Sequence, residues 1–193
     1  VAKKHPEVGV ITCSEADREL MSKELPDNEV VMIPQHHCNF ERVRRTRNKI
    51  EVVGCIGTRG AYDFLPKSLE GELGKRNMKL LFFSRFFYRQ DIIDFYNKVD
   101  VQIVWRPYKK ILSNPLKIVN ASSFGIPTIA LDETAFKEVK ECYVPVSNLE
   151  GFLESLDALR ASQEVYKEVA QKCIEKSEDY HISHVAQLYK NLQ

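Results

Sequence analysis

Three loops in this sequence combine residue types that can bind an anion, and each loop follows a short apolar run. The first loop is the glycine-rich turn GCIGTRG at residues 54–60. Glycines let a backbone approach an anion closely, and a guanidinium such as that of Arg59 can pair with a phosphate through two parallel hydrogen bonds. A tight turn that needs positive φ explains the glycines equally well. The candidate ligand-binding residues of this turn are Gly57, Thr58 and Arg59.

The second loop, at residues 84–89, places three aromatic residues beside Arg85. Aromatic rings at the edge of a sheet can stack on a nucleobase, with the guanidinium of Arg85 close by. The alternative, which we favour, is that the side chains of Phe86, Phe87 and Tyr88 pack the loop itself.

The third loop, at residues 106–117, carries the strongest ligand signal of the chain. It is basic, and it leads into a helix that Pro115 is expected to open and Gly125 to end. The N-terminus of a helix attracts anions through its dipole and its backbone N–H groups, so a pyrophosphate fits here. Ser113 or Asn114 is the expected N-cap. The alternative is a solvated basic loop; the candidate residues are Arg106, Lys109, Asn114, Pro115 and Lys117.

Other residue clusters favour no chemistry of their own. The triplet His36-His37-Cys38 is contiguous and has no fourth ligand at a suitable spacing, so we expect no metal site. The basic residues between Arg42 and Lys49 are expected to belong to a solvated linker, with contact to anionic lipid or to nucleic acid as alternatives. The five cysteines are scattered and odd in number, which predicts free thiols in a reducing compartment and a cytoplasmic location.

The composition is that of an ordinary globular domain. The chain has 193 residues, 44% of them hydrophobic and 28% charged, with a formal net charge of +1. This balance gives no global positive field, so we expect no nucleic-acid partner. No apolar run approaches the roughly 18 residues that span a bilayer. The N-terminus has no signal-peptide core, and it has no initial Met, which suggests an excised fragment.

Short apolar runs alternate with amphipathic segments along most of the chain. The runs are β-branched or uniformly apolar, as in strands buried on both faces, and strands that alternate with helices predict a parallel sheet. A helix capped by Ser14 is expected to reach Leu25, and two further helices are expected at residues 89–98 and 115–124. After the last expected strand, three successive helices are expected at residues 150–160, 163–176 and 181–192. The expected strands are residues 8–12, 30–33, 50–56, 79–83, 101–105, 128–131 and 143–146.

Two stretches resemble the donor-binding signature of GT-B glycosyltransferases: VDVQIVWR at residues 99–106 and NPLKIVNASSFGIPTIA at residues 114–130. Lys117, Ala121, Gly125 and Pro127 stand where the family pattern has the same residue types. Further matches extend the resemblance over nearly the whole chain, but only over the second half of a two-domain enzyme. Residues 8–14, residues 30–34 and Phe40 resemble the end of the N-terminal domain and the interdomain linker. Residues 50–57 resemble the first strand and phosphate turn of the C-terminal domain, and residues 179–192 resemble its final helix. Asp132 and Glu138 resemble the acidic residues of a later loop.

The resemblance implies an α/β fold with three parts. Residues 1–49 end the N-terminal domain and form the interdomain linker. Residues 50–178 form a Rossmann-like donor-binding domain, a parallel sheet with helices on both faces, and residues 179–193 form a helical C-terminal extension that crosses back toward the missing N-terminal domain.

The resemblance also implies a function, the binding of a nucleotide-diphosphate sugar for transfer to an acceptor held by the missing domain. Positive side chains and helix N-termini stabilise the leaving diphosphate in this fold, so no cofactor or obligatory metal is implied. Any general base would come from the missing domain, so no catalytic residue is assigned and little transfer is expected from this chain alone. Many such enzymes work at the inner face of a membrane, which makes peripheral contact with lipid possible. The implied donor-binding residues are Gly57, Thr58, Arg59, Arg85, Arg106, Lys109, Asn114, Pro115, Lys117 and Asn120.

One departure from the family pattern keeps other functions open. Retaining members usually carry two glutamates separated by seven residues, and the aligned positions here are Leu112 and Asn120. Asn120 can hydrogen-bond a ribose hydroxyl, whereas Leu112 cannot. The alternatives are a non-catalytic nucleotide- or partner-binding module, or another enzyme of this fold such as a sugar-nucleotide epimerase or a polyol-phosphate transferase. The glycine-rich turn also resembles that of short-chain dehydrogenases, but no tyrosine has a lysine four residues later.

Overall fold

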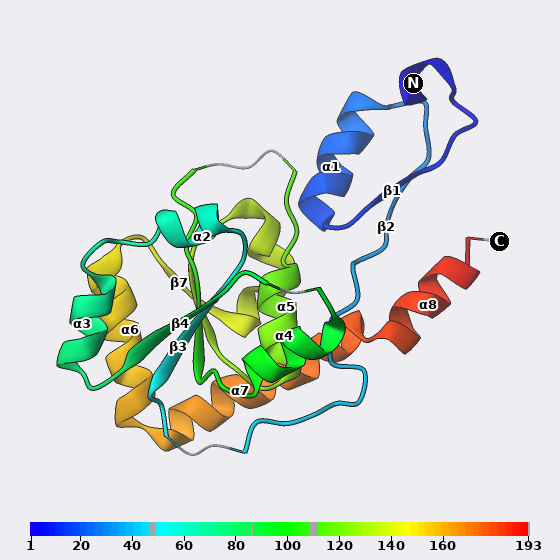
Figure 1. Ribbon diagram of the computed structural model, residues 1–193. Coiled ribbons are helices and arrows are strands. Elements are labelled where there is room, and N and C mark those ends of the chain that lie inside the picture. Colours follow the sequence, from blue (N-terminus) through cyan, green and yellow to red (C-terminus); the bar gives the residue numbers. More distant parts are fainter. Residues whose placement is uncertain (47–48, 86, 109–111, 193) are drawn as a thin grey trace.

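The structure, a computed structural model, describes residues 1–46, 49–85, 87–108 and 112–192. It contains two parallel sheets (Figure 1). The smaller sheet pairs β1 (Val10–Thr12) with β2 (Val30–Met32), and α1 (Glu15–Glu24) connects the two strands. A 3-10 turn (Ala2–Lys4) precedes them. This N-terminal unit lies beyond one end of the larger sheet (Figure 1).

The larger sheet has the strand order β4-β3-β5-β6-β7, and all its pairs are parallel. The chain adds β4 on one side of β3 and then crosses to add β5 on the other side, so the strand order reverses between β3 and β5. The predicted α/β fold with a parallel sheet is therefore confirmed, and each expected strand exists. The strands are β3 (Val52–Ile56), β4 (Lys79–Phe83), β5 (Val101–Val104), β6 (Thr128–Leu131) and β7 (Tyr143–Val146).

Helices cover both faces of this sheet, as predicted (Figure 1). Leu73 of α3 and Leu156 of α6 share one buried cluster with Val53. Phe95 of α4 and Phe124 of α5 belong to a cluster on the other face. The α-helices are α2 (Arg59–Asp63), α3 (Leu69–Lys75), α4 (Arg89–Tyr96), α5 (Leu116–Ser123), α6 (Leu149–Ala161), α7 (Gln163–Ser177) and α8 (Ile182–Lys190), and 3-10 segments span Thr134–Cys142 and Glu178–Tyr180.

Gly54 lies in the middle of β3, where the sheet meets α4 and the turn after it. A Cβ at this position would lie 2.4 Å from Cγ2 of Val99 and 2.9 Å from Cζ of Phe95. Both neighbours are buried, so neither can move away without disturbing the core. We expect Gly54→Ala to lower the free energy of unfolding by about 1–3 kcal/mol through overpacking, measured by urea denaturation. Gly71→Ala is the matched control, because nothing lies within 4 Å of a Cβ on Gly71; equal losses in both variants would contradict the close contact at Gly54.

Two helix ends follow the predicted capping chemistry. The side chain of Ser14 accepts a hydrogen bond from the backbone N of Asp17 (3.1 Å), as expected for the N-cap of α1. In a complete capping box the carboxylate of Asp17 would accept a hydrogen bond from the backbone N of Ser14. It instead accepts one from the backbone N of Ser113 (3.2 Å). Gly125 follows α5 with a φ of 71°, which is the left-handed conformation of a glycine C-cap.

The segment between β2 and β3 packs against α5 at its central residues, while the basic residues after them are mostly exposed, as expected for a solvated linker; the exception is Arg45, whose side chain is 6% exposed. His37, Cys38 and Asn39 are buried. The amide Nδ2 of Asn39 donates to the carbonyl oxygen of Ser123 at the end of α5 (2.7 Å). These backbone contacts come from polar residues, which is why the segment shows no apolar periodicity.

His37 is 1% exposed, and its Nδ1 accepts a hydrogen bond from the backbone N of Asn39 (3.2 Å). Burial, together with the neighbouring His181 ring, lowers the pKa of His37 to about 4. The unfolded chain keeps a histidine pKa of about 6.5 and therefore binds the proton first as the pH falls. We expect the stability that neutral His37 provides to be lost progressively between about pH 6.5 and pH 4. His37→Asn keeps an acceptor for the backbone N of Asn39 but does not titrate in this range. Its melting temperature should therefore fall less than that of the unmodified chain as the pH is lowered. Identical pH profiles of the two melting temperatures would contradict the assignment of this pH dependence to His37.

Candidate functional site

A cavity of about 310 Å³ lies at the carboxyl ends of β3 and β5, where the strand order reverses. Open parallel sheets bind ligands at this point, because the loops that follow the two strands run apart there. Ile56 and Val104 line the cavity from the strands, and α2 and the first turn of α5 line it from the sides. The polar side chains that line it include those of Thr58, Arg106, Ser113, Asn114 and Lys117.

Lys117 lies on the first turn of α5 and reaches the glycine-rich turn after β3. Its Nζ lies 2.9 Å from the position that a Cβ on Gly57 would occupy, so the glycine leaves room for the ammonium group. The carbonyl oxygen of Lys117 accepts a hydrogen bond from Nε2 of buried Gln102 (3.0 Å). Tyr96 and Thr128 hold the Gln102 amide through hydrogen bonds of 2.9 and 3.1 Å. This buried network fixes the first turn of α5, and with it the cation, beside the cavity.

Arg106 follows β5 and is held by an internal ion pair. Its Nε donates to Oε1 of Glu133 (2.9 Å), and its Nη2 contacts the other oxygen of that carboxylate. The same Nη2 donates to Oγ of Ser113 (2.7 Å). Glu133 offsets much of the positive charge, so Arg106 attracts an anion less strongly than its sequence position suggests.

The predicted helix N-terminus lies at the cavity, one residue later than expected. Pro115 is the N-cap of α5 and makes no side-chain cap. Oδ1 of Asn114 accepts a hydrogen bond from the backbone N of Leu116 (3.2 Å), and its Nδ2 donates to Gln35 (3.2 Å). Ser113, the other expected cap, binds Arg106 instead. The dipole of α5 therefore acts at the cavity, with Asn114 bracing its first turn.

Other predicted donor-binding residues lie away from the cavity lining. Arg59 is exposed on α2, where it pairs with Asp63 (3.2 Å) one turn later. Arg85 is exposed on the loop after β4. Lys109 lies outside the described residues.

Asn120 holds the linker rather than lining the cavity. Its Oδ1 accepts a hydrogen bond from the backbone N of Cys38 (2.8 Å). Pro115 is buried and is not among the residues that line the cavity. Leu112, at the position of the other family glutamate, is half exposed.

Two aromatic residues at the mouth of the cavity were not among the sequence candidates. Phe64 and Tyr108 both line the cavity, both are about half exposed, and their ring centroids lie 5.1 Å apart. Such a pair can pack against a planar base. The only signals in the sequence were their positions, Phe64 just after the glycine-rich turn and Tyr108 inside the basic loop.

The aromatic loop after β4 does not behave as expected. Phe87 is 82% exposed and Tyr88 is 75% exposed, so the prediction that these rings pack the loop is wrong. Oδ2 of Asp91 accepts hydrogen bonds from the backbone N of both residues (3.1 and 3.0 Å). Backbone hydrogen bonds at the start of α4, rather than ring packing, hold this loop. Phe86 lies outside the described residues.

A second cavity, of about 610 Å³, adjoins the first and shares Arg106, Tyr108 and Ser113 with it. It lies between α1 of the N-terminal unit and the end of β6. Three carboxylates line it, those of Asp17, Asp132 and Glu133. Carboxylate oxygens accept hydrogen bonds from hydroxyl groups, so this cavity suits a polyhydroxylated group.

The thiol nearest the first cavity is not a nucleophile. Cys55 lines the cavity, and burial raises its pKa to about 11 although Lys117 acts in the opposite direction. A neutral thiol is a poor nucleophile. The pKa of Cys13 is likewise raised, by burial and by Asp17.

Within the described residues, no group of three or more His, Cys, Asp or Glu side chains is arranged to hold a metal ion. His37 and Cys38 of the contiguous triplet are buried, while His36 is exposed with its ring against Phe40. Among the described helices, none combines the length and the apolar character needed to cross a membrane.

No protein-family profile matches this chain. No curated protein matches it by sequence either. Many of the solved structures that it resembles are glycosyltransferases, at low sequence identity. One is a glycosyltransferase from Rickettsia africae, with 13% identity and a TM-score of 0.70 over 99% of this chain and 65% of that one.

Two further solved structures show the same pattern. Sucrose-phosphate synthase from Thermosynechococcus elongatus has 14% identity and a TM-score of 0.66, over 95% of this chain and 58% of that one. HepE from Anabaena, in complex with UDP and glucose, has 13% identity and a TM-score of 0.65, over 95% of this chain and 62% of that one. This chain therefore has the fold of GT-B glycosyltransferases, and it spans less than two thirds of the length of each of these three proteins.

Proposed function

We propose that the chain is the donor-binding half of a glycosyltransferase and that it binds a nucleotide-diphosphate sugar in the cavity between β3 and β5. The observation that carries the proposal is the position of Lys117 and of the α5 N-terminus at the point where the strand order reverses. The similar HepE structure contains UDP and glucose, which supports a ligand of the same class here.

The diphosphate is assigned to the side of the cavity that α5 forms. The ammonium group of Lys117 and the positive end of the helix dipole attract it, while Thr58 and Asn114 offer neutral hydrogen-bond donors. Negative charge grows on the diphosphate as the glycosidic bond to it breaks. Groups that are already in place stabilise this charge without reorganising, so the same residues would lower the barrier to transfer.

The two ends of the donor are assigned to the remaining features of the site. The base packs against Phe64 and Tyr108 at the mouth of the first cavity. The sugar enters the adjoining cavity, where Asp17, Asp132 and Glu133 can accept hydrogen bonds from its hydroxyl groups. These carboxylates would take over the role of the family glutamates that are replaced by Leu112 and Asn120 in this chain.

The acceptor is assigned to a separate N-terminal domain. We propose that residues 1–49 form the end of that domain and the linker, that residues 50–178 bind the donor, and that the last helix contacts the other domain. The β1–β2 sheet has only two strands, and Val8 and Ile11 beside it are exposed. A general base from that domain would complete the reaction, so this chain by itself should bind the donor and transfer little. Cytoplasmic location and peripheral contact with a membrane remain predictions.

The test is a thermal-shift scan with UDP, GDP, CDP, ADP and TDP, with NAD and NADP as controls. A nucleotide present at about 100 times its dissociation constant stabilises a protein by roughly 2.7 kcal/mol, which raises the melting temperature of a domain of this size by several degrees. One diphosphate should give this shift and the two dinucleotides should not. A response to NAD alone, or to none of the diphosphates, would exclude a donor-binding role.

The second candidate is a non-catalytic module, and the contact of Asn120 favours it. The side chain that aligns with a family glutamate bonds to the linker backbone at Cys38, which is a structural role. The two candidates differ in a nucleotide-binding experiment, because a partner-binding module shows no diphosphate response. If a diphosphate binds, product analysis with the complete two-domain protein separates a glycosyltransferase from a sugar-nucleotide epimerase.

A further inference from the structure

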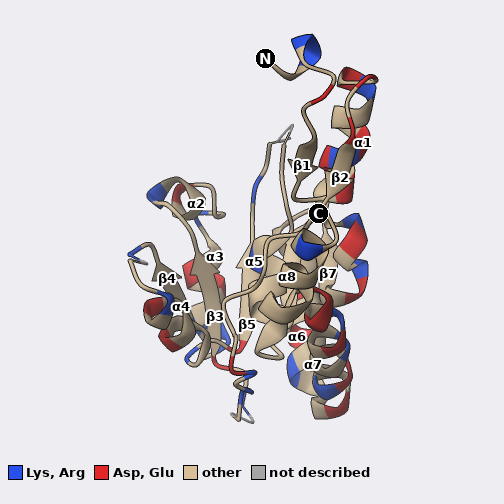
Figure 2. Cartoon of the chain, turned by 90° about the vertical axis from the view of Figure 1, so that its right-hand side faces the viewer, with Lys and Arg blue, Asp and Glu red and all other residues tan. Residues whose placement is uncertain are grey.

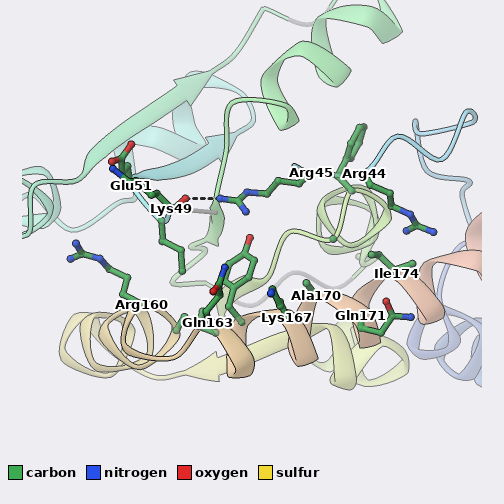
Figure 3. A pocket seen from close by; sticks show the side chains of 15 residues that line it. Arg44, Arg45, Lys49, Glu51, Arg160, Gln163, Lys167, Ala170, Gln171 and Ile174 are labelled. Carbon is green, nitrogen blue, oxygen red and sulfur yellow. Dashed lines mark hydrogen bonds between the residues drawn. The ribbon is translucent and has the colours of Figure 1, made fainter. Parts of the chain in front are cut away.

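A cavity of about 680 Å³ lies at the amino ends of the strands of the larger sheet, opposite the carboxyl ends that form the proposed donor site. The chain between β2 and β3 forms one wall, and α7 with the end of α6 forms the other (Figure 3). The C-terminal end of α5, at Phe124 and Gly125, closes it. None of its lining residues contributes to the cavity between β3 and β5, so it is a separate site.

Among the described residues, four exposed cations line this cavity. Lys49 and Arg160 lie toward one end with Glu51, Arg44 lies toward the other end near Gln171, and Lys167 lies between the two ends (Figure 3). Within the described residues, none of these four cations forms a salt bridge. Arg45 also lines the cavity, but its guanidinium is committed to Asp100 (2.7 Å).

The three lysines of α7, Lys167, Lys172 and Lys176, differ in their ion pairing. Basic and acidic side chains are interspersed along α7 (Figure 2). Outside the cavity they pair: Lys172 with Glu168 (2.8 Å) and Lys176 with Asp179 (2.9 Å). Lys167, on the same helix, faces the cavity and has no such partner among the described carboxylates. The arrangement leaves a concentration of positive charge where the wall is concave, and a concave wall focuses the field of such charges.

The cavity also offers apolar surface. Ile50, Ala170 and Ile174 line it and are partly buried, and the ring of Tyr166 lies behind them. A ligand with an anionic group and a less polar body can therefore bury its body along α7 while its charged group meets the cations. A single carboxylate carries one charge and would leave most of these cations without a counterpart.

We propose that this cavity binds a phosphate-bearing ligand, at a site independent of the proposed donor site. A phosphate ester carries up to two negative charges and three acceptor oxygens, which matches arginine forks and lysine ammonium groups that approach from several sides. Two sources share this chemistry, a free phosphorylated molecule and the headgroup of an anionic phospholipid. The proposal takes up the alternative of lipid contact for the basic residues between Arg42 and Lys49, because Arg44 and Lys49 line one cavity together with Arg160 and Lys167.

The test uses pyrophosphate as the probe, in the Lys117→Ala background so that the proposed donor site does not contribute. Bound pyrophosphate should protect the amines of Lys49 and Lys167 from acetylation, as mapped by mass spectrometry of the labelled chain. Lys167→Glu should weaken pyrophosphate binding by roughly tenfold or more, because it replaces a charge-assisted contact with a repulsive one. Lys172→Glu is the matched control on the same helix and should have little effect, since Lys172 lies outside the cavity.

A second arm identifies the source of the phosphate. Phosphatidylcholine vesicles with phosphatidic acid should retain the chain in a sedimentation assay if the natural ligand is a lipid headgroup, and Lys167→Glu should release it. Protection by pyrophosphate without vesicle binding indicates a free phosphorylated molecule. Protection of other lysines only, equal effects of the two charge reversals, or no binding in either arm would overturn the proposal, whatever the outcome at the donor site.

Discussion

Lys117→Ala should weaken the binding of the preferred nucleoside diphosphate by roughly ten- to a hundredfold. A hydrogen bond to a charged group contributes about 1.5–3 kcal/mol, and each 1.4 kcal/mol corresponds to a tenfold change in affinity. Lys117 lines the cavity together with the α5 N-terminus, and Arg106, a second cation of the described lining, is largely balanced by Glu133. Isothermal titration calorimetry with this chain measures the effect directly.

Two variants separate a loss of binding from a loss of folding. Lys172→Ala removes a lysine from α7, outside the cavity, and should leave the affinity unchanged. Gly57→Ala keeps Lys117 but places a Cβ 2.9 Å from its Nζ and 2.8 Å from Cβ of Ala61, so it should also weaken binding by displacing the ammonium group. The melting temperature of Lys117→Ala without ligand, measured beside the affinity, shows whether this variant is folded. Unchanged affinity in both cavity variants would remove the basis for the donor-site assignment.

The features of the fold that the sequence predicts are those that depend on local patterns. Strands buried on both faces leave uniform apolar runs such as residues 52–56, and capping residues such as Ser14 and Gly125 mark helix ends within the same few positions. The proposed donor site is partly local in the same sense. Lys117 and Asn114 lie within one turn of a helix start, and Arg106 follows a strand, so their proximity could be inferred from the chain order.

The features that the sequence does not predict depend on contacts between distant segments. Asn120 faces the backbone N of Cys38, which is 82 positions away, and no local spacing indicates that pairing. The same holds for the pair of Phe64 and Tyr108, which come from loops after different strands. Arg45 is the clearest example. It lies in a run of basic residues that looks solvated, yet its partner, Asp100, lies in the turn before β5.

Asp100→Ala should lower the free energy of unfolding by about 3–5 kcal/mol, because it leaves a buried guanidinium without a counter-ion. The side chains of Arg45 and Asp100 are only 6% and 0% exposed, and Nη2 of Arg45 lies 2.7 Å from Oδ1 of Asp100. Oδ2 of Asp100 accepts hydrogen bonds from the backbone N of Glu51 (2.7 Å) and of Val52 (2.8 Å), so the carboxylate also joins the start of β3 to β5. For a domain of this size the loss corresponds to a fall in melting temperature of roughly 6–20 °C, measurable by calorimetry.

The matched control is Asp157→Ala, which breaks the exposed ion pair of Asp157 with Arg76 (3.0 Å) and should cost no more than about 1 kcal/mol. Arg45→Leu combined with Asp100→Ala should be less destabilised than Asp100→Ala alone, because the unpaired charge is removed with its partner. The recovery should be partial, since the backbone N–H groups of Glu51 and Val52 still lose their acceptor. If Asp100→Ala and Asp157→Ala have equal effects, the ion pair does not hold the linker against the sheet. If the double variant recovers fully, the two backbone hydrogen bonds contribute nothing, and the start of β3 must be fixed by its ladders to β4 and β5.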